Sequence, residues 1–138
     1  MTAWIIAALL FAANVPQPQK PADQALEHLA KIDRFAFGGV GYAGTTSEGE
    51  KDYNLILAGP SAEADFEKLY SIGNLQAKCY ALVGLRKLDR ERFEELATSL
   101  QTSTRDVLTQ SGCLVFPQPL RLIVDSIRAG VYPRAASR

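Results

Sequence analysis

The sequence has very few of the residues from which most catalytic and metal sites are built. It contains one histidine, His28, and two cysteines among 138 residues. A structural zinc site takes about four nitrogen or sulfur ligands, so these three side chains are too few to form one. The sequence contains no G-x-S-x-G nucleophile motif, and Cys113 has no basic sequence neighbour to lower the pKa of its thiol. We therefore expect no metal, no cofactor and no catalytic residue.

A net charge is absent as well, because fifteen Lys and Arg residues balance fifteen Asp and Glu residues. No overall field would draw the protein to nucleic acid or to an anionic membrane, so we expect no nucleic-acid partner. Hydrophobic residues make up 47% and charged residues 22% of the chain, the usual mixture for a soluble globular protein. The length suits a single domain with one hydrophobic core.

The chain also lacks an apolar run of membrane-spanning length. The run from Trp4 to Ala13 is short of the roughly 20 residues that a spanning helix needs, and it suits the core of a secretion signal. Two features favour the alternative, an N-terminal hydrophobic segment that packs on the domain or acts as an uncleaved anchor. No Lys or Arg precedes the run, and bulky Phe11 stands where a cut after Ala13 prefers a small residue. We expect residues 1–19 to be one of the two, the protein to be periplasmic or secreted, and no stable membrane span if the signal is cleaved.

The two cysteines, Cys79 and Cys113, are an even number in a chain that we expect to be exported. This combination favours a disulfide bond. Closing the loop between them would stabilise the fold by about 3 to 4 kcal/mol in the chain-entropy model. The alternative is two buried free thiols, because cysteine is among the most buried residue types.

Residues 74–101 predict two helices joined by one tight corner. Asn74 and Asp89 are good N-caps for the two helices. The first helix is apolar over most of its circumference, which indicates that other elements surround it. We expect it to lie at the centre of the fold.

The rest of the chain predicts further helices and one strand pair. Residues 20–132 should form a single, mainly α domain of stacked antiparallel helix pairs, and residues 133–138 a flexible tail. Pro117 and Pro119 should end a short β-hairpin near residues 105–116. The remaining predicted elements are a first helix from Pro21 to Asp33, a helix opened by a Ser47–Glu50 capping box and ended by Gly59, a helix capped by Ser61 and ended by Gly73, and a last helix from Leu120 to Gly130.

The central pair of predicted helices resembles a HEAT-type or armadillo-type helical hairpin. The residues that carry the resemblance are AKCYALVGL, the corner from Lys87 to Arg90, and RFEELATSL, all within residues 74–101. The resemblance implies a stacking scaffold that binds other proteins by a groove or an edge. It implies no catalytic residue.

A literal G-x-G-x-x-G motif lies between Gly39 and Gly44. In a dinucleotide-binding site such glycines follow a buried strand within a βαβ unit, and neither feature is predicted here. The next helix opens with acidic residues, which would repel a phosphate. We therefore expect a turned connector, with Tyr42 exposed on the surface.

Two functions remain open. The first is an exported, non-enzymatic protein-interaction or scaffold domain with an unknown protein partner. The second is a small extracytoplasmic hydrolase or enzyme inhibitor with a site of Ser, Thr and carboxylate side chains in the glycine-rich loop. His28 is expected to be solvated. The residues expected to form the contact surface are Gly39, Gly41, Tyr42, Gly44 and Tyr132.

Overall fold

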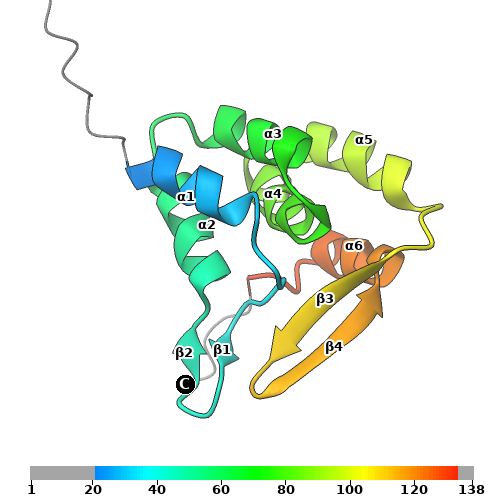
Figure 1. Cartoon of the computed structure of the whole chain (residues 1–138). Coiled ribbons are helices and arrows are strands. Elements are labelled where there is room, and N and C mark those ends of the chain that lie inside the picture. The colour runs from blue at the N-terminus through cyan, green and yellow to red at the C-terminus, as the bar shows by residue number, and fades with distance from the viewer. Residues whose placement is uncertain (1–20, 134–138) are drawn as a thin grey trace, which may run out of the picture.

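The structure is a computed structural model that describes residues 21–133 (Figure 1). Within this range the fold is mainly α with six helices, as the sequence predicted, and it has two small antiparallel strand pairs, of which the sequence predicted only the second. The predicted N-terminal signal or hydrophobic segment lies outside the described residues, as does the predicted tail apart from Pro133. The elements in chain order are α1 (Pro21–Leu29), β1 (Gly39–Val40), β2 (Thr45–Thr46), α2 (Glu48–Ala58), α3 (Ala62–Ile72), α4 (Leu75–Leu88), α5 (Arg90–Leu100), β3 (Asp106–Ser111), β4 (Leu114–Pro119) and α6 (Leu120–Arg128).

Helix α4 lies at the centre of the core. It contacts α2, α3, α5, α6 and β3, and its residues from Cys79 to Leu85 are all buried. The Asn74 side chain caps it by accepting a hydrogen bond from Ala77 N–H at 2.9 Å, and Asp89 caps α5 by accepting one from Arg92 N–H at 3.1 Å. The prediction of a central helix is thus confirmed, and N-capping explains where both helices begin.

Two helical glycines allow the closest approaches in this core. A Cβ atom at Gly84 of α4 would lie 2.4 Å from the Phe66 ring of α3, and one at Gly49 of α2 would lie 2.3 Å from the Tyr80 hydroxyl of α4. Real Cβ atoms do not approach other atoms so closely. Glycine is therefore required at both positions by packing rather than by backbone conformation.

The ends of the other helices differ in part from the sequence prediction. Helix α1 stops at Leu29 instead of Asp33, because the carbonyls of Ala30 and Ile32 accept hydrogen bonds from the backbone and side chain of Asn74. Half of the predicted capping box forms, since Ser47 Oγ accepts from the N–H of Glu50. The Ser61 side chain makes no capping hydrogen bond to α3.

The two strand pairs are joined edge to edge. Strand β3 pairs with β4 on one side, and on its other side it lies beside the segment from Phe35 to Gly41. Phe35 N–H donates to Leu108 C=O at 2.8 Å, and Gly41 N–H donates to Gly112 C=O at 2.9 Å. The two hairpins are therefore separate two-stranded sheets linked by isolated bridges, and they extend from the same side of the helical body (Figure 1).

The predicted β-hairpin near 105–116 is confirmed, but its second strand is longer than expected. Strand β4 continues through Pro117 and Pro119, which pair with Leu108 and Asp106. A proline lacks an N–H but fits an edge strand where that group would point away from the neighbour. The expectation that Pro117 ends the strand was wrong, because β4 is an edge strand, whereas Pro119 is its last residue.

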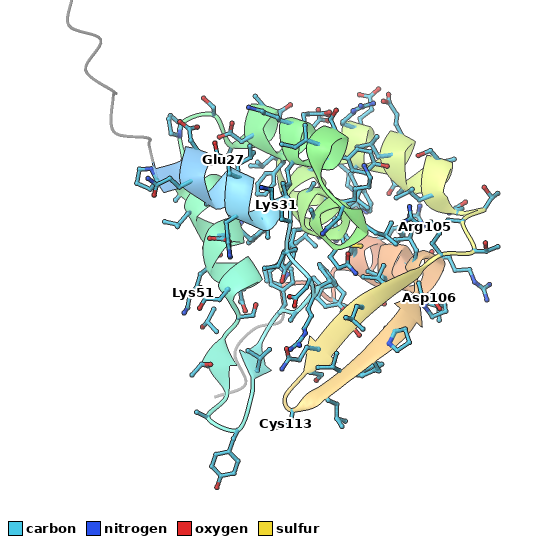
Figure 2. The ribbon with its side chains drawn as sticks, in the orientation of Figure 1. Glu27, Lys31, Lys51, Arg105, Asp106 and Cys113 are labelled. Atoms are coloured by element: carbon cyan, nitrogen blue, oxygen red, sulfur yellow. The ribbon has the colours of Figure 1, made fainter. Side chains whose placement is uncertain are left out.

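The disulfide prediction is also wrong, because both cysteines are free. Cys79 is completely buried in α4, whereas Cys113 is exposed in the turn between β3 and β4 (Figure 2). The hairpin holds Cys113 at its tip, away from the helical core in which Cys79 lies. The cysteine count therefore gives no support to export.

No helix among residues 21–133 is long and apolar enough to cross a membrane. The resemblance of α4 and α5 to a HEAT-type or armadillo-type unit stays a prediction.

Candidate functional site

The tips of the two hairpins bring exposed apolar side chains to one end of the molecule. The side chain of Tyr42, between β1 and β2, is fully exposed at 102%. At the start of β4, Leu114, Val115 and Phe116 are 69%, 42% and 37% exposed. We call these four residues the hairpin-tip surface. Large apolar side chains that gather on a surface indicate a contact site more often than isolated ones do.

Exposed apolar side chains elsewhere in the described residues are spread over separate elements. Each of the helices α2, α3, α4 and α6 has one, and a fifth follows α6; these residues are Leu55, Ile72, Leu88, Leu122 and Val131. Single exposed apolar residues are normal on soluble proteins and need no functional explanation. The hairpin-tip surface differs because its members lie at the tips of two neighbouring hairpins, with Leu114 and Phe116 on one face of β4 and Val115 on the other.

Along one face of the β3–β4 hairpin, the side chains become more exposed towards the tip. Alternate strand residues share a face, so Val107 and Thr109 of β3 lie on the same side of the hairpin as Phe116, the partner of Thr109, and Leu114 of β4. Val107 and Thr109 are buried against the helical body, whereas Phe116 and then Leu114 become increasingly exposed towards the tip. The tip therefore extends past the helical body and exposes its inner face.

A cavity of about 120 Å³ lies where this inner face leaves the core. Aromatic rings form much of its wall, and Tyr132, which follows α6, packs edge-on against Phe35 at a centroid distance of 5.0 Å. The lining residues are Phe35, Ala36, Phe37, Thr109, Gln110, Ser111, Phe116, Gln118 and Tyr132.

A network of hydrogen bonds fixes the base of the glycine-rich loop, which forms the β1–β2 hairpin. Buried Tyr80 Oη accepts from the N–H of Ala36 and donates to its C=O, each at 2.9 Å, and Ser47 Oγ donates to the same carbonyl at 2.8 Å. The Glu50 carboxylate accepts from Gly38 N–H at 3.0 Å. The loop is thus fixed at its base by α2 and α4, which positions β1 against β3.

The turn residues explain why this loop is rich in glycine. Gly41 and Gly44 have φ angles of +71° and +61°, in the left-handed region that other residues seldom adopt. They form a β-hairpin turn rather than a strand-to-helix turn, and they place Tyr42 at its tip.

Polar groups near the loop are already engaged in ways that do not suit hydrolysis. A neighbouring cavity of about 260 Å³ includes Ser47 and Glu48 in its lining. The Ser47 hydroxyl caps α2 and bonds Ala36, while Thr45 Oγ1 lies 3.5 Å from Val40 C=O. A hydrogen bond from Lys51 lowers the pKa of Glu48, the opposite of the change that a general acid needs. Neither Ser47 nor Thr45 contacts a carboxylate or an imidazole through its side chain.

His28 is half-exposed, close to the solvated position that the sequence predicted, but it has a partner. Its imidazole Nδ1 hydrogen-bonds the Asp52 carboxylate of α2. This hydrogen bond, and then the charge of Asp52, raises the pKa of His28. The pair joins α1 to α2 and lies apart from Ser47 and the threonines. Among the described residues, no three or more His, Cys, Asp or Glu side chains lie so that they could hold a metal ion together.

The structure brings only part of the predicted contact surface together. Tyr42 is exposed as expected, whereas Tyr132 is half-buried and lines the aromatic cavity. The glycines shape the turn. Sequence reasoning missed the contribution of Leu114, Val115 and Phe116, because a short run of apolar residues after a turn is equally consistent with a buried strand.

No protein-family model, curated protein or solved structure matches this chain.

Proposed function

We propose that the protein is a non-enzymatic interaction domain that binds a protein partner through the hairpin-tip surface. The exposure of Tyr42, Leu114, Val115 and Phe116 at one end of the molecule carries this proposal. Burying such side chains against a partner removes apolar surface from water, which is the main driving force of protein association. Aromatic residues are also enriched in the contacts that dominate binding energy.

The contrast between polar side chains that hold the glycine-rich loop and exposed apolar side chains at the hairpin tips supports a binding surface rather than a catalytic one. The side chains of Ser47 and Glu50 form hydrogen bonds that position the loop. These two groups, which could take part in hydrolysis, are therefore already engaged in holding the fold. The apolar residues at the tips have no such function in the fold. We therefore prefer binding to the hydrolase or inhibitor alternative.

Export is the second part of the proposal and rests on the sequence alone. The apolar run from Trp4 to Ala13 suits a secretion signal. Mass spectrometry of the mature protein would test it: a new N-terminus near residue 14 is expected, and an intact Met1 on a cytosolic protein would contradict it.

Site-specific photo-crosslinking tests the binding surface. A photoreactive phenylalanine analogue at position 42 should crosslink a specific protein in the native extract. The same analogue at Ile72, a 55% exposed residue on α3, is the matched control and should not. A triple variant, Leu55→Ser with Ile72→Ser and Leu122→Ser, should keep the partner, whereas Tyr42→Ser with Leu114→Ser and Phe116→Ser should lose it. Equal recovery with both triple variants would refute the proposal.

A further inference from the structure

The geometry of the hairpin end leads us to propose how the partner is recognised. We propose that the aromatic cavity beneath the β3–β4 hairpin receives one uncharged apolar side chain from an extended segment of a protein partner. This inference rests on the proposed function, because it places an anchor point next to the hairpin-tip surface. The cavity and that surface share Phe116.

The size of the cavity selects a single side chain. Its volume of about 120 Å³ is the share of roughly four water molecules in the liquid, and an engineered cavity of about 150 Å³ in another protein holds one benzene. Sites for drug-sized molecules and cofactors run from about 300 to 1,000 Å³. A leucine, proline or phenylalanine side chain has a suitable size, and a nucleotide does not.

The chemistry of the wall selects an uncharged occupant. None of the nine lining residues carries a carboxylate, ammonium, guanidinium or imidazole group. The rings of Phe35, Phe37, Phe116 and Tyr132 provide the apolar part of the lining, and uncharged polar side chains provide the rest. A charged side chain would therefore lose its hydration without gaining an ion pair. The hydroxyl of Thr109 is already used, since it donates to Phe116 C=O at 2.9 Å.

One lining residue can orient the main chain of the partner. The side-chain amide of Gln118 makes no hydrogen bond with any of residues 21–133, unlike that of Gln110, which bonds Arg34 and Gly112. An amide offers both a donor and an acceptor. Gln118 is therefore available to hydrogen-bond a backbone peptide group of a segment whose side chain enters the cavity.

The exposed edge of β4 makes strand addition an unfavourable way to bind. Ser111 and Leu114 flank the two-residue turn as a hydrogen-bonded pair, so by alternation the backbone of Val115, Pro117 and Pro119 points outward. Two of these three residues are prolines and have no N–H to donate. A partner strand would find one donor along this edge, so recognition must come from side chains rather than from an added strand.

Small capped amino acids test the cavity without a known partner. We would titrate N-acetyl-leucinamide, N-acetyl-prolinamide and N-acetyl-phenylalaninamide, with the lysine and aspartate analogues as charged controls. At least one uncharged probe should shift the aromatic NMR signals of Phe35, Phe37 and Tyr132, with a dissociation constant in the millimolar range, whereas the charged probes should not. Absence of any saturable shift at these rings would overturn the inference.

Cavity-filling variants locate the binding. Gln118→Trp, or Ser111→Phe if the first variant fails to fold, should weaken probe binding by at least about tenfold, a typical effect of a filled or misfitting apolar pocket. The control Gln24→Trp on the exposed side of α1 should leave it unchanged, as should Tyr42→Ser.

The crosslinked partner separates this inference from the proposed function. If the hairpin-tip triple variant loses the partner but Gln118→Trp and Ser111→Phe keep it, the interaction domain stands and the anchoring cavity is refuted. Loss of the partner in all of them supports both.

Discussion

Helix α4 buries nearly all of its apolar side chains, whereas the tip of the β3–β4 hairpin exposes them. From Cys79 to Leu85 every side chain of α4 is buried, and the neighbouring helices approach it at van der Waals contact. From Leu114 to Phe116 three consecutive apolar side chains of β4 are exposed. The first region uses its apolar surface to hold the fold together, whereas the second contributes little to folding at its tip. The difference separates the residues that determine stability from those available for binding.

Each of the two regions contains one cysteine, Cys79 in α4 and Cys113 in the turn of the hairpin. The largest expected difference between the regions is in the rates at which these two thiols react. Cys113 in the exposed turn should react with Ellman's reagent in the native protein. Cys79 is fully buried, and burial raises the pKa of its thiol. It should react only after opening of the core, at least about a thousandfold more slowly, because opening a core element costs most of the global stability of about 5 kcal/mol or more.

The thiol count provides the control. Cys113→Ser should abolish the fast reaction and leave one thiol that appears in denaturant. If no thiol reacts in denaturant without a reductant, the cysteines are bonded and the assigned positions of both regions are wrong.

Replacing a glycine by alanine should cost more stability in α4 than in the β1–β2 turn. Gly84→Ala should destabilise the protein by about 2 to 3 kcal/mol, because its Cβ would meet the Phe66 ring and overpack the core. Gly41→Ala should cost about 1 kcal/mol from its positive φ alone, since no atom lies within 4 Å of a Cβ there. Urea unfolding gives both values. Adding Phe66→Leu to Gly84→Ala should recover part of the loss, and an unchanged loss would argue against the steric cause.

The sequence was sufficient for the helices but not for these contacts. Apolar periodicity predicted that α4 is central, because that pattern is local. The close approach at Gly49 depends on Tyr80, which is distant along the chain and brought near only by packing. β-Favouring residues on both sides of a turn-like centre predicted the β-hairpin. They could not show that Pro117 lies in an edge strand or that Leu114 extends past the helices, because both depend on which neighbours the strand lacks.

Two buried tyrosines of the core differ in the hydrogen bonding of their hydroxyl groups. Tyr80 Oη bonds both the N–H and the C=O of buried Ala36, whereas Tyr53 Oη is buried without a partner among the described residues. Tyr80→Phe should cost about 1 to 3 kcal/mol, because it leaves a buried N–H unsatisfied. Tyr53→Phe should be neutral or slightly stabilising. Equal losses in chemical denaturation would contradict this assignment.

The same residues should determine stability in alkali. Burial raises the pKa of Tyr53 and of Tyr80 to about 12. Both groups must stay protonated in the folded state, so their contribution is complete below the unfolded pKa of about 10 and is lost as pH rises from 10 to 12. Tyr53→Phe should therefore flatten the fall in stability above pH 10, and an unchanged slope would contradict this.

The smallest expected effect concerns the contact between α1 and α2, which lies outside both regions. The Asp52 carboxylate raises the pKa of His28, so the pair contributes fully below the unfolded pKa of about 6.5 and loses its contribution as pH rises through the folded value. His28 is 58% exposed, which limits the effect to below about 1 kcal/mol. A double-mutant cycle of His28→Gln and Asp52→Asn should give a coupling at pH 5.5 that fades by pH 8.5. Because neither residue touches the hairpins, Cys113 reactivity should remain the same throughout the cycle; a change in it would mean that α1 and the hairpin tips are not independent.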